Sequence, residues 1–231
     1  MRTHYWETRQ SMTPQKALDF LKEGNERFLN NLRINRNFLQ LVNETAENQF
    51  PFTAILSCSD SRISTELIFD QGLGDIFSIR LAGNVASINA IGSMEYACKI
   101  LGSKLALVMG HTGCGAIKSA CDGASLDNLN EVLSQIHPSI NAENETTENR
   151  NSANKQFLNN VAKLNVVRNM NVIVQESAIL SEMLGQGEIN LLGAMYDVET
   201  GRVEFFCEDT HQAKAIENGV LKPAKKLNQE V

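Results

Sequence analysis

The stretches FTAILSCSDSR (52–62) and KLALVMGHTGCGA (104–116) decide how this chain folds. Each begins with a short, almost wholly apolar run of the kind that is typical of a buried strand. The first run leads directly into Cys58 and the second into His111. Because ligands of open parallel sheets bind beyond the carboxyl ends of the strands, the ends of these two strands are where a site is expected.

Around these two stretches, apolar runs alternate with segments of helical spacing, which predicts an α/β fold with a mainly parallel central sheet. Thr13 is suited to be the N-cap of the first helix, with Pro14 at its first position. The predicted strands are 52–57, 75–80, 104–110 and 171–174, followed by a hairpin over 189–206. The predicted helices are 13–32, 90–101, one beginning at 114–121, 126–136, 153–168 and one ending at 184.

Two polar segments interrupt this pattern. Residues 35–50 have no periodicity and are expected on the surface or against a partner subunit. Residues 122–152 are rich in Asn, Glu, Ser and Thr and are interpreted as a polar insertion, apart from the short helix given above. The whole chain, 1–231, is therefore predicted to be one domain, with residues 1–50 as an N-terminal helical arm.

Composition excludes several classes of protein. The formal net charge is −6, and no run of Lys or Arg is longer than Lys225–Lys226, which argues against a nucleic-acid partner. No segment reaches the roughly 18 consecutive apolar residues of a membrane helix, and no apolar signal-peptide core follows the N-terminus. Five cysteines at irregular spacing do not suggest a disulfide framework, so a reducing, cytoplasmic location is expected.

A metal site is the chemistry that the two strand ends suggest. His111 and Cys114 form an H-x2-C pair, and Cys58 is the candidate third ligand from the other strand end. Catalytic zinc sites hold three protein ligands of this kind and keep a fourth position open. A dinucleotide-binding domain would need G-x-G-x-x-G after the first strand, where this chain has CSDSR.

The spacing by itself leaves simpler interpretations open. An H-x2-C pair arises by chance, and a buried cysteine is usually a small apolar side chain. For Cys98, Cys121 and Cys207 this simple role is preferred, because no histidine or acid accompanies them in a metal-like pattern. His4, His137 and His211 fit no zinc motif, and Asp60 with Arg62 could be an ordinary surface ion pair.

Several motifs in order resemble the β-class carbonic anhydrases. They are CSDSR (58–62), DQGLGDIFSIRLAGNVAS (70–87) and GSMEYACKILGSKLALVMGHTGCGAI (92–117), with weaker similarity at 13–28 and 193–206. The resemblance covers most of the chain apart from the polar insertion. It implies a four-stranded parallel sheet with an added edge strand, flanked by helices, in a homodimer or homotetramer.

The resemblance also assigns roles at the strand ends. Cys58, His111 and Cys114 match the family's zinc ligands, and the activity implied is the reversible hydration of CO2 to bicarbonate by zinc-bound hydroxide. Asp60 and Arg62 match the pair that orients this hydroxide. In some members of the family the pair breaks and the aspartate becomes a fourth zinc ligand. For this chain we expect the open form.

Substrate contacts are implied for four further residues: Gln49, Phe77, Tyr96 and Gly115. The first three match the plant-like subtype, in which they typically enter the site from a neighbouring subunit. The other subtype has a tryptophan three residues before the first zinc cysteine, where this chain has Ile55. Arg80 matches an arginine that both subtypes share.

Two alternatives remain beside a carbonic anhydrase. One is a related zinc hydrolase of CS2 or COS, which would share the zinc ligands. The other is a non-catalytic, zinc-stabilised binding module. Structural zinc sites are closed by four protein ligands, and here only Asp60 could be the fourth.

Overall fold

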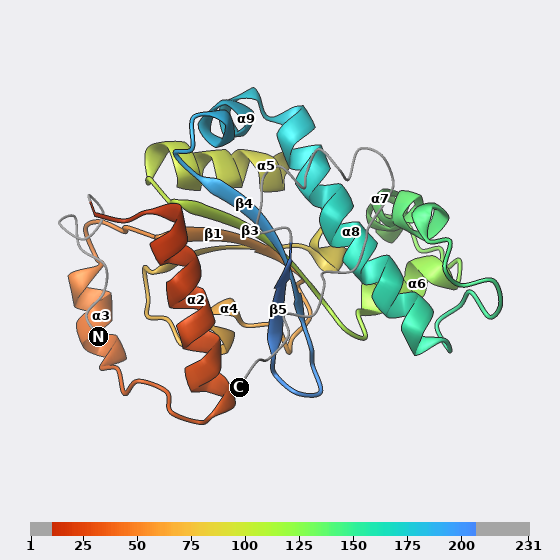
Figure 1. The fold of residues 1–231 in the computed structure, drawn as a ribbon, viewed down its shortest axis with the longest axis horizontal. Coiled ribbons are helices and arrows are strands. Elements are labelled where there is room, and N and C mark those ends of the chain that lie inside the picture. The colour runs from red at the N-terminus through yellow and green to blue at the C-terminus, as the bar shows by residue number, and fades with distance from the viewer. Residues whose placement is uncertain (1–10, 207–231) are drawn as a thin grey trace, which may run out of the picture.

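A five-stranded sheet forms the centre of the protein (Figure 1). The computed structural model describes residues 11–206. The strands are ordered β2-β1-β3-β4-β5, with the first four parallel and β5 antiparallel to β4. They span Thr53–Ser57 (β1), Ile76–Arg80 (β2), Leu105–His111 (β3), Asn190–Tyr196 (β4) and Val203–Phe206 (β5). The predicted fold class, a mainly parallel four-stranded sheet with an edge strand, is confirmed.

The order of the strands reverses between β1 and β3. The chain moves from β1 outward to β2 on one side and then returns to place β3 on the other side of β1. Such a reversal is the point at which open α/β sheets bind ligands. In the register, Ser57 of β1 lies opposite Met109 of β3, so Cys58 and His111 follow at the same edge of the sheet.

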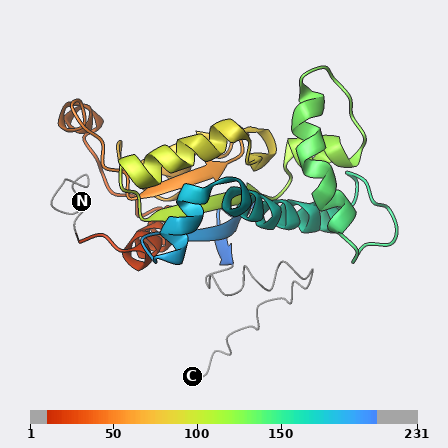
Figure 2. The same cartoon turned by 90° about the horizontal axis from the view of Figure 1, so that it is seen from above.

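Helices cover both faces of the sheet. The side chains of Leu56 and Val108 face a core formed with α5, α8 and α9, whereas Ile55 and Leu107 face a core formed with α2 and α4. Figures 1 and 2 agree that α3 lies at one end of the molecule and α6 and α7 lie at the other. The helices are α2 Pro14–Leu29, α3 Phe38–Glu44, α4 Thr65–Ile68, η1 Ala82–Asn84, α5 Ile88–Glu95 with its π-helical extension η2 Tyr96–Ile100, α6 Gly115–Cys121, α7 Leu129–Ala142, α8 Lys155–Glu176 and α9 Ala178–Gly185.

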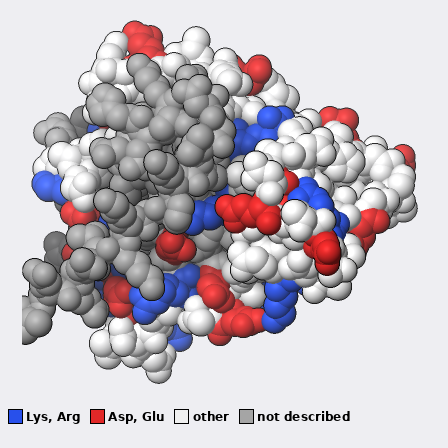
Figure 3. Space-filling view, turned by 45° about the vertical axis from the view of Figure 1, so that its right-hand side comes forward, with Lys and Arg blue, Asp and Glu red and all other residues white. Residues whose placement is uncertain are grey.

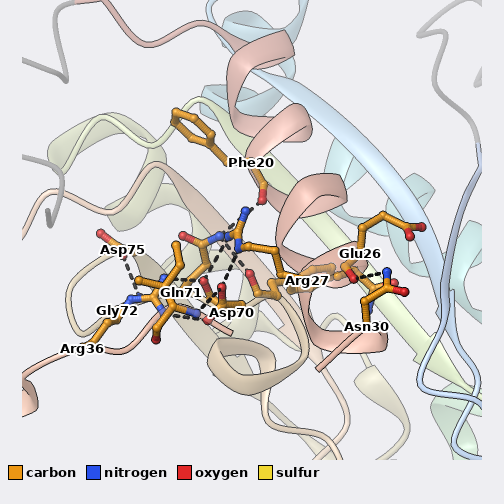
Figure 4. A network of polar contacts seen from close by, with 12 residues as sticks. Phe20, Glu26, Arg27, Asn30, Arg36, Asp70, Gln71, Gly72 and Asp75 are labelled. Carbon is orange, nitrogen blue, oxygen red and sulfur yellow. Dashed lines mark hydrogen bonds and ion pairs between the residues drawn. The ribbon is translucent and has the colours of Figure 1, made fainter. Parts of the chain in front are cut away.

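A buried carboxylate fastens the N-terminal arm to the sheet. Asp70, which is only 3% exposed, accepts hydrogen bonds from Arg27 Nε at 2.6 Å and Arg36 Nη1 at 2.6 Å (Figure 4). Arg36 also donates to the Asp70 carbonyl oxygen, and the Ile34 N–H donates to the carboxylate. The two arginines flank the segment between α2 and α3, so this one carboxylate fixes the path of the arm.

The start of α2 follows the sequence prediction. The Thr13 hydroxyl accepts a hydrogen bond from the Lys16 N–H, and Pro14 occupies the first helical position. Pro is tolerated there because its missing N–H would have had no partner within the helix.

One predicted strand is wrong. Residues 171–174 (NVIV) belong to α8, which continues without interruption to Glu176. Their β-branched side chains favoured a strand, but Val166, Met170 and Ile173 form one buried helical face. Asn169 is buried as well, and this polar residue, just beyond the predicted helix 153–168, obscured the apolar periodicity by which the rest of α8 would have been recognised.

Both polar segments are more ordered than their composition indicates. The segment 35–50 contains α3, whose N-cap Asn37 accepts from the Gln40 N–H. Within 122–152, helix α7 extends beyond the predicted 126–136, to Ala142. The part of this segment that follows α7 is held by Glu143, whose Oε2 accepts a hydrogen bond from Arg150 Nη1 at 2.5 Å.

The described residues lack the features of a membrane span, and one face of them lacks those of a nucleic-acid surface. Among residues 11–206, no helix is both long and apolar enough to cross a bilayer. On the face shown in Figure 3, acidic and basic side chains are interspersed over the described surface. This face therefore presents no extended basic stripe of the kind that binds nucleic acid.

Candidate metal centre

Three potential metal ligands meet at the edge of the sheet. Cys58 follows β1, His111 is the last residue of β3, and Cys114 is the N-cap of α6. Their ligand atoms all lie within 4.8 Å of one another, and the three side chains are buried. Gly113, with φ of 65°, makes the tight turn that brings Cys114 back towards His111. The structure thus brings together the three residues that the sequence suggested.

The spacing of the donor atoms fits a zinc ion. The sulfurs of Cys58 and Cys114 are 3.9 Å apart. Two Zn–S bonds of about 2.3 Å at the tetrahedral angle would separate the sulfurs by about 3.8 Å. His111 Nδ1 lies 3.0 Å from the Thr112 carbonyl oxygen. Since that oxygen can only accept, Nδ1 carries the hydrogen and Nε2 keeps its lone pair.

The orphaned nitrogen of His111 supports the same conclusion. His111 Nε2 is buried and has no hydrogen-bond partner among the described residues. A buried polar atom without a partner costs free energy, and a metal ion would remove that cost. The donor set of two sulfurs and one imidazole is one that zinc prefers.

The surroundings of Cys58 favour its thiolate form. The pKa of Cys58 is lowered to about 4, chiefly by the hydrogen bond from the Cys114 thiol. His111 and the backbone N–H groups of Asp60 and Gly83 act in the same direction, against the effect of burial. The Asp60 N–H lies 3.4 Å from the sulfur. The pKa of Cys114 is raised, because the proton shared by the two sulfurs remains with it.

An aspartate and an arginine lie beside the three ligands. Arg62 Nε and Nη2 donate to the two carboxylate oxygens of Asp60 at 2.9 and 2.8 Å. This forked pair holds the pKa of Asp60 well below its usual range. Asp60 Oδ2 remains 4.0 Å from His111 Nε2. The pair is therefore formed, and the aspartate faces the ligand cluster without belonging to it.

The backbone that carries Cys58 and Asp60 is braced from β2. Arg80 Nη2 donates to the Asp60 carbonyl oxygen at 2.7 Å, and Arg80 Nε donates to the Cys58 carbonyl oxygen at 3.3 Å. In this structure Arg80 therefore fixes the turn that presents the candidate ligand and its neighbouring acid.

The four predicted substrate contacts divide into two groups. Gly115 is the first residue of α6 and is exposed next to Cys114. Phe77 and Tyr96 lie side by side, with ring centroids 6.0 Å apart, but Phe77 is level with Ala54, four residues before Cys58. That is about 13 Å along the strand. Gln49 precedes β1 and so lies at the end of the strand opposite to Cys58. Within one chain, only Gly115 is at the ligand cluster.

Among the described residues, Cys98, Cys121 and His137 lie apart from this cluster. Cys98 is buried and its pKa is raised to about 12 by burial, and Cys121 is half-buried with its pKa raised to about 11, also mainly by burial. His137 is exposed on α7. His4, His211 and Cys207 lie outside the described residues.

Two residues near the site were not predicted from the sequence. Gly83 lies in the loop after β2, whose Leu81 is hydrogen-bonded to the residues on both sides of Cys58, and Asn165 of α8 donates to the Gly83 carbonyl oxygen. The positive φ of Gly83 could have been anticipated from the AGN triplet, since glycine often marks such a conformation. A single asparagine in a long helix carries no comparable signal.

Comparison with known proteins shows consistent similarity. A family model described as carbonic anhydrase matches residues 53–203. A protein named carbonic anhydrase 2 from Mycobacterium tuberculosis is 32% identical over 197 residues, which cover 82% of this chain and 91% of the relative. A carbonic anhydrase of Pseudomonas aeruginosa is 33% identical over 178 residues, covering 71% of this chain and 77% of the relative.

Solved structures show the same fold. The β-carbonic anhydrase CafA of Aspergillus fumigatus matches with a TM-score of 0.64 at 25% identity, covering 77% of this chain and 86% of that one. A structure from a study of two tetrameric β-carbonic anhydrases of Sordaria macrospora matches with a TM-score of 0.63 at 24% identity, covering 73% and 87%.

Proposed function

The chain belongs to the β-carbonic anhydrase family, and on that premise we propose that it catalyses the zinc-dependent, reversible hydration of CO2 to bicarbonate and a proton. The observation that carries the proposal is the buried cluster of Cys58, His111 and Cys114 beside a carboxylate that is kept ionised. A zinc ion bound there supplies hydroxide near neutral pH, because it lowers the pKa of water towards about 7.

Asp60 is proposed to orient the nucleophile. Arg62 keeps Asp60 ionised, so the carboxylate acts as a hydrogen-bond acceptor and holds a water proton rather than delivering one. Arg62 also engages both oxygens, which keeps the carboxylate from turning towards the ligand cluster. This arrangement supports an open site and argues against a structural zinc site closed by four protein ligands.

Gly115 is proposed to stabilise the substrate. It begins α6 directly after Cys114, and no heavy atom lies within 4 Å of the position that a Cβ would take there. The backbone N–H at this position would donate a hydrogen bond to an oxygen of CO2 or bicarbonate as charge develops.

Gln49, Phe77 and Tyr96 are proposed to act in the site of a second copy of the chain. Gln49 precedes β1, Phe77 lies about 13 Å along the strands from Cys58, and Tyr96 packs against Phe77, so none of the three reaches the metal centre of its own chain. Tyr96 is nevertheless 47% exposed and packs against Phe77, so the pair is available to a neighbour. A homodimer or homotetramer with shared sites follows from this proposal. The tetrameric assemblies of the Sordaria enzymes are a precedent.

Stopped-flow CO2 hydration with a pH indicator, together with zinc analysis, tests the proposal. The purified protein is expected to contain close to one zinc per chain and to accelerate hydration well above the buffer rate. Cys114→Ser is the matched control, because it removes one ligand atom and is expected to lose both zinc and activity. A zinc-containing protein with no CO2 hydration would refute the proposal, and turnover of CS2 or COS by that protein would identify the related hydrolase.

A further inference from the structure

The loop that follows β2 is held against Cys58 by its backbone. The Leu81 N–H donates to the Ser57 carbonyl oxygen at 3.0 Å, and the Ser59 N–H donates to the Leu81 carbonyl oxygen at 3.3 Å. Cys58 therefore lies between two hydrogen bonds to the same residue. Gly83 follows two residues further along the same loop, and its backbone contributes to the lowered pKa of Cys58.

Gly83 is held in one conformation from its other side. Its φ of 67° belongs to the left-handed region, which glycine adopts readily. A Cβ at this position would lie 2.8 Å from Ile136 Cδ1 and 3.3 Å from Ala116 Cβ, so α7 and α6 pack directly on the residue. Its carbonyl oxygen accepts a hydrogen bond from Asn165 Nδ2 at 2.8 Å.

Asn165 is itself fully oriented. It is completely buried in α8, and its Oδ1 lies 3.3 Å from the Ser139 hydroxyl of α7. Because the Gly83 carbonyl can only accept, Nδ2 must face Gly83 and Oδ1 must face Ser139. The result is a chain of contacts from α7 through α8 to the loop whose Leu81 is hydrogen-bonded on both sides of Cys58.

We propose that Asn165 is a positioning residue for the candidate metal ligand Cys58, acting through the loop of Leu81 and Gly83, with Ser139 fixing the orientation of its amide. The proposal rests on the metal centre described under the proposed function. It also assigns a role to the polar insertion, since α7 contributes Ser139 and Ile136 to the support of the site.

The neighbouring Asn169 shows why this role differs from general packing. Asn169 lies one turn further along α8 and is also buried. It binds the same loop, accepting from the Ala86 N–H at 2.8 Å, but Ala86 lies three residues beyond Gly83. Asn169 therefore shares the stabilising contribution of Asn165 without the connection to Cys58.

The test compares Asn165→Leu with Asn169→Leu in the full chain. Zinc affinity is measured by competition with a chelator, and the sulfur-to-metal charge-transfer band is recorded after loading with Co²⁺. Removing a residue that supports a metal ligand typically weakens metal binding by about 10- to 100-fold. We expect a loss of at least about tenfold for Asn165→Leu. Its cobalt band should shift or weaken, because a displaced sulfur overlaps less well with the metal.

Asn169→Leu is expected to lower the thermal midpoint to a similar degree while leaving zinc affinity and the cobalt band near the wild-type values. Equal losses of zinc affinity in the two variants would overturn the proposal, as would wild-type zinc affinity in Asn165→Leu. If Asn165→Leu does not fold, Ser139→Ala decides: weaker zinc binding with the same change in the band supports the proposal, and unchanged values overturn it.

Measurements on the wild-type protein distinguish a failure of this inference from a failure of the proposed function. If it binds zinc without hydrating CO2, the proposed function fails while the affinity comparison still tests Asn165. If the wild type is active and Asn165→Leu binds zinc equally well, the inference alone fails.

Discussion

Two aspartates of this chain, Asp60 and Asp70, are each paired with arginine and each have a lowered pKa, yet they occupy different settings. Asp70 is 3% exposed, and both of its carboxylate oxygens are occupied by arginines of the N-terminal arm. Asp60 is 16% exposed and has one arginine partner only two residues away in the chain. Its Oδ2 also faces His111, at 4.0 Å from Nε2.

The contrast shows how the same type of ion pair supports structure in one place and chemistry in another. At Asp70, burial raises the pKa, and the hydrogen bonds from Arg27 and Arg36 outweigh this effect. At Asp70, both carboxylate oxygens therefore serve to hold together segments that are distant in sequence. At Asp60 the arginine fixes the charge and the orientation of the carboxylate, but one oxygen remains directed at the candidate metal ligands.

Asp70→Asn should have the largest effect, and it should be on stability. The left-handed backbone at position 70 suits asparagine, so the change removes the charge and one of the two acceptor oxygens without straining the backbone. Breaking a buried ion pair by removing one partner costs about 3–5 kcal/mol. Denaturant titration should show a loss of this size in the free energy of unfolding, with the zinc content of the folded fraction unchanged. A loss below about 1 kcal/mol would place Asp70 among ordinary surface pairs.

Asp60→Asn should have a large effect on activity and a small effect on stability. Losing the orientation of a nucleophile typically costs about 100-fold in rate. We expect kcat for CO2 hydration to fall by about that factor in stopped-flow assays. The free energy of unfolding should change by no more than about 1 kcal/mol, because the Arg62 side chain is largely exposed. Retained activity with lowered stability would invert the comparison and assign Asp60 a structural role.

Acid should weaken the wild-type protein through Asp70. The folded-state pKa of Asp70 lies below its unfolded value of about 3.9, so its stabilisation is present above that value and is lost as pH falls through the folded pKa. The difference in unfolding free energy between the wild type and Asp70→Asn should therefore shrink as pH is lowered from 7 to about 3. A difference that stays constant over this range would mean that the Asp70 charge does not contribute.

Glu26→Gln provides the baseline for an exposed pair. Glu26 lies 3.3 Å from Arg202, and both side chains are more than half exposed. Surface substitutions of this kind usually change stability by less than about 0.5 kcal/mol. Thermal unfolding in low and high salt should confirm that the effect is small. A larger effect would show that exposure alone does not separate Asp60 from Asp70.

Most of the sheet could be predicted because its signals are local. The apolar runs gave β1, β2 and β3, and the hairpin over β4 and β5 was confirmed by their antiparallel pairing. The error at 171–174 arose because buried Asn169, just beyond the predicted part of α8, interrupts its apolar face and a β-branched run follows. Asparagine belongs on such a face only when specific partners satisfy its amide, and those partners lie far away in sequence.

The sequence by itself determined the features whose parts are close together along the chain. Strand ends carry Cys58 and His111, one tight turn separates His111 from Cys114, and two residues separate Asp60 from Arg62. Short-range backbone geometry is sufficient to bring such groups together. The metal centre could be inferred for this reason, once the two strands were assigned to one sheet.

Only the tertiary structure decided which distant groups complete these features. Arg27 and Arg36 reach Asp70 from 43 and 34 residues away, and Asn165 reaches Gly83 across 82 residues. It also showed that Phe77 and Tyr96 lie away from the metal centre of their own chain. Such contacts depend on how helices pack on the sheet, and no residue spacing encodes that packing directly.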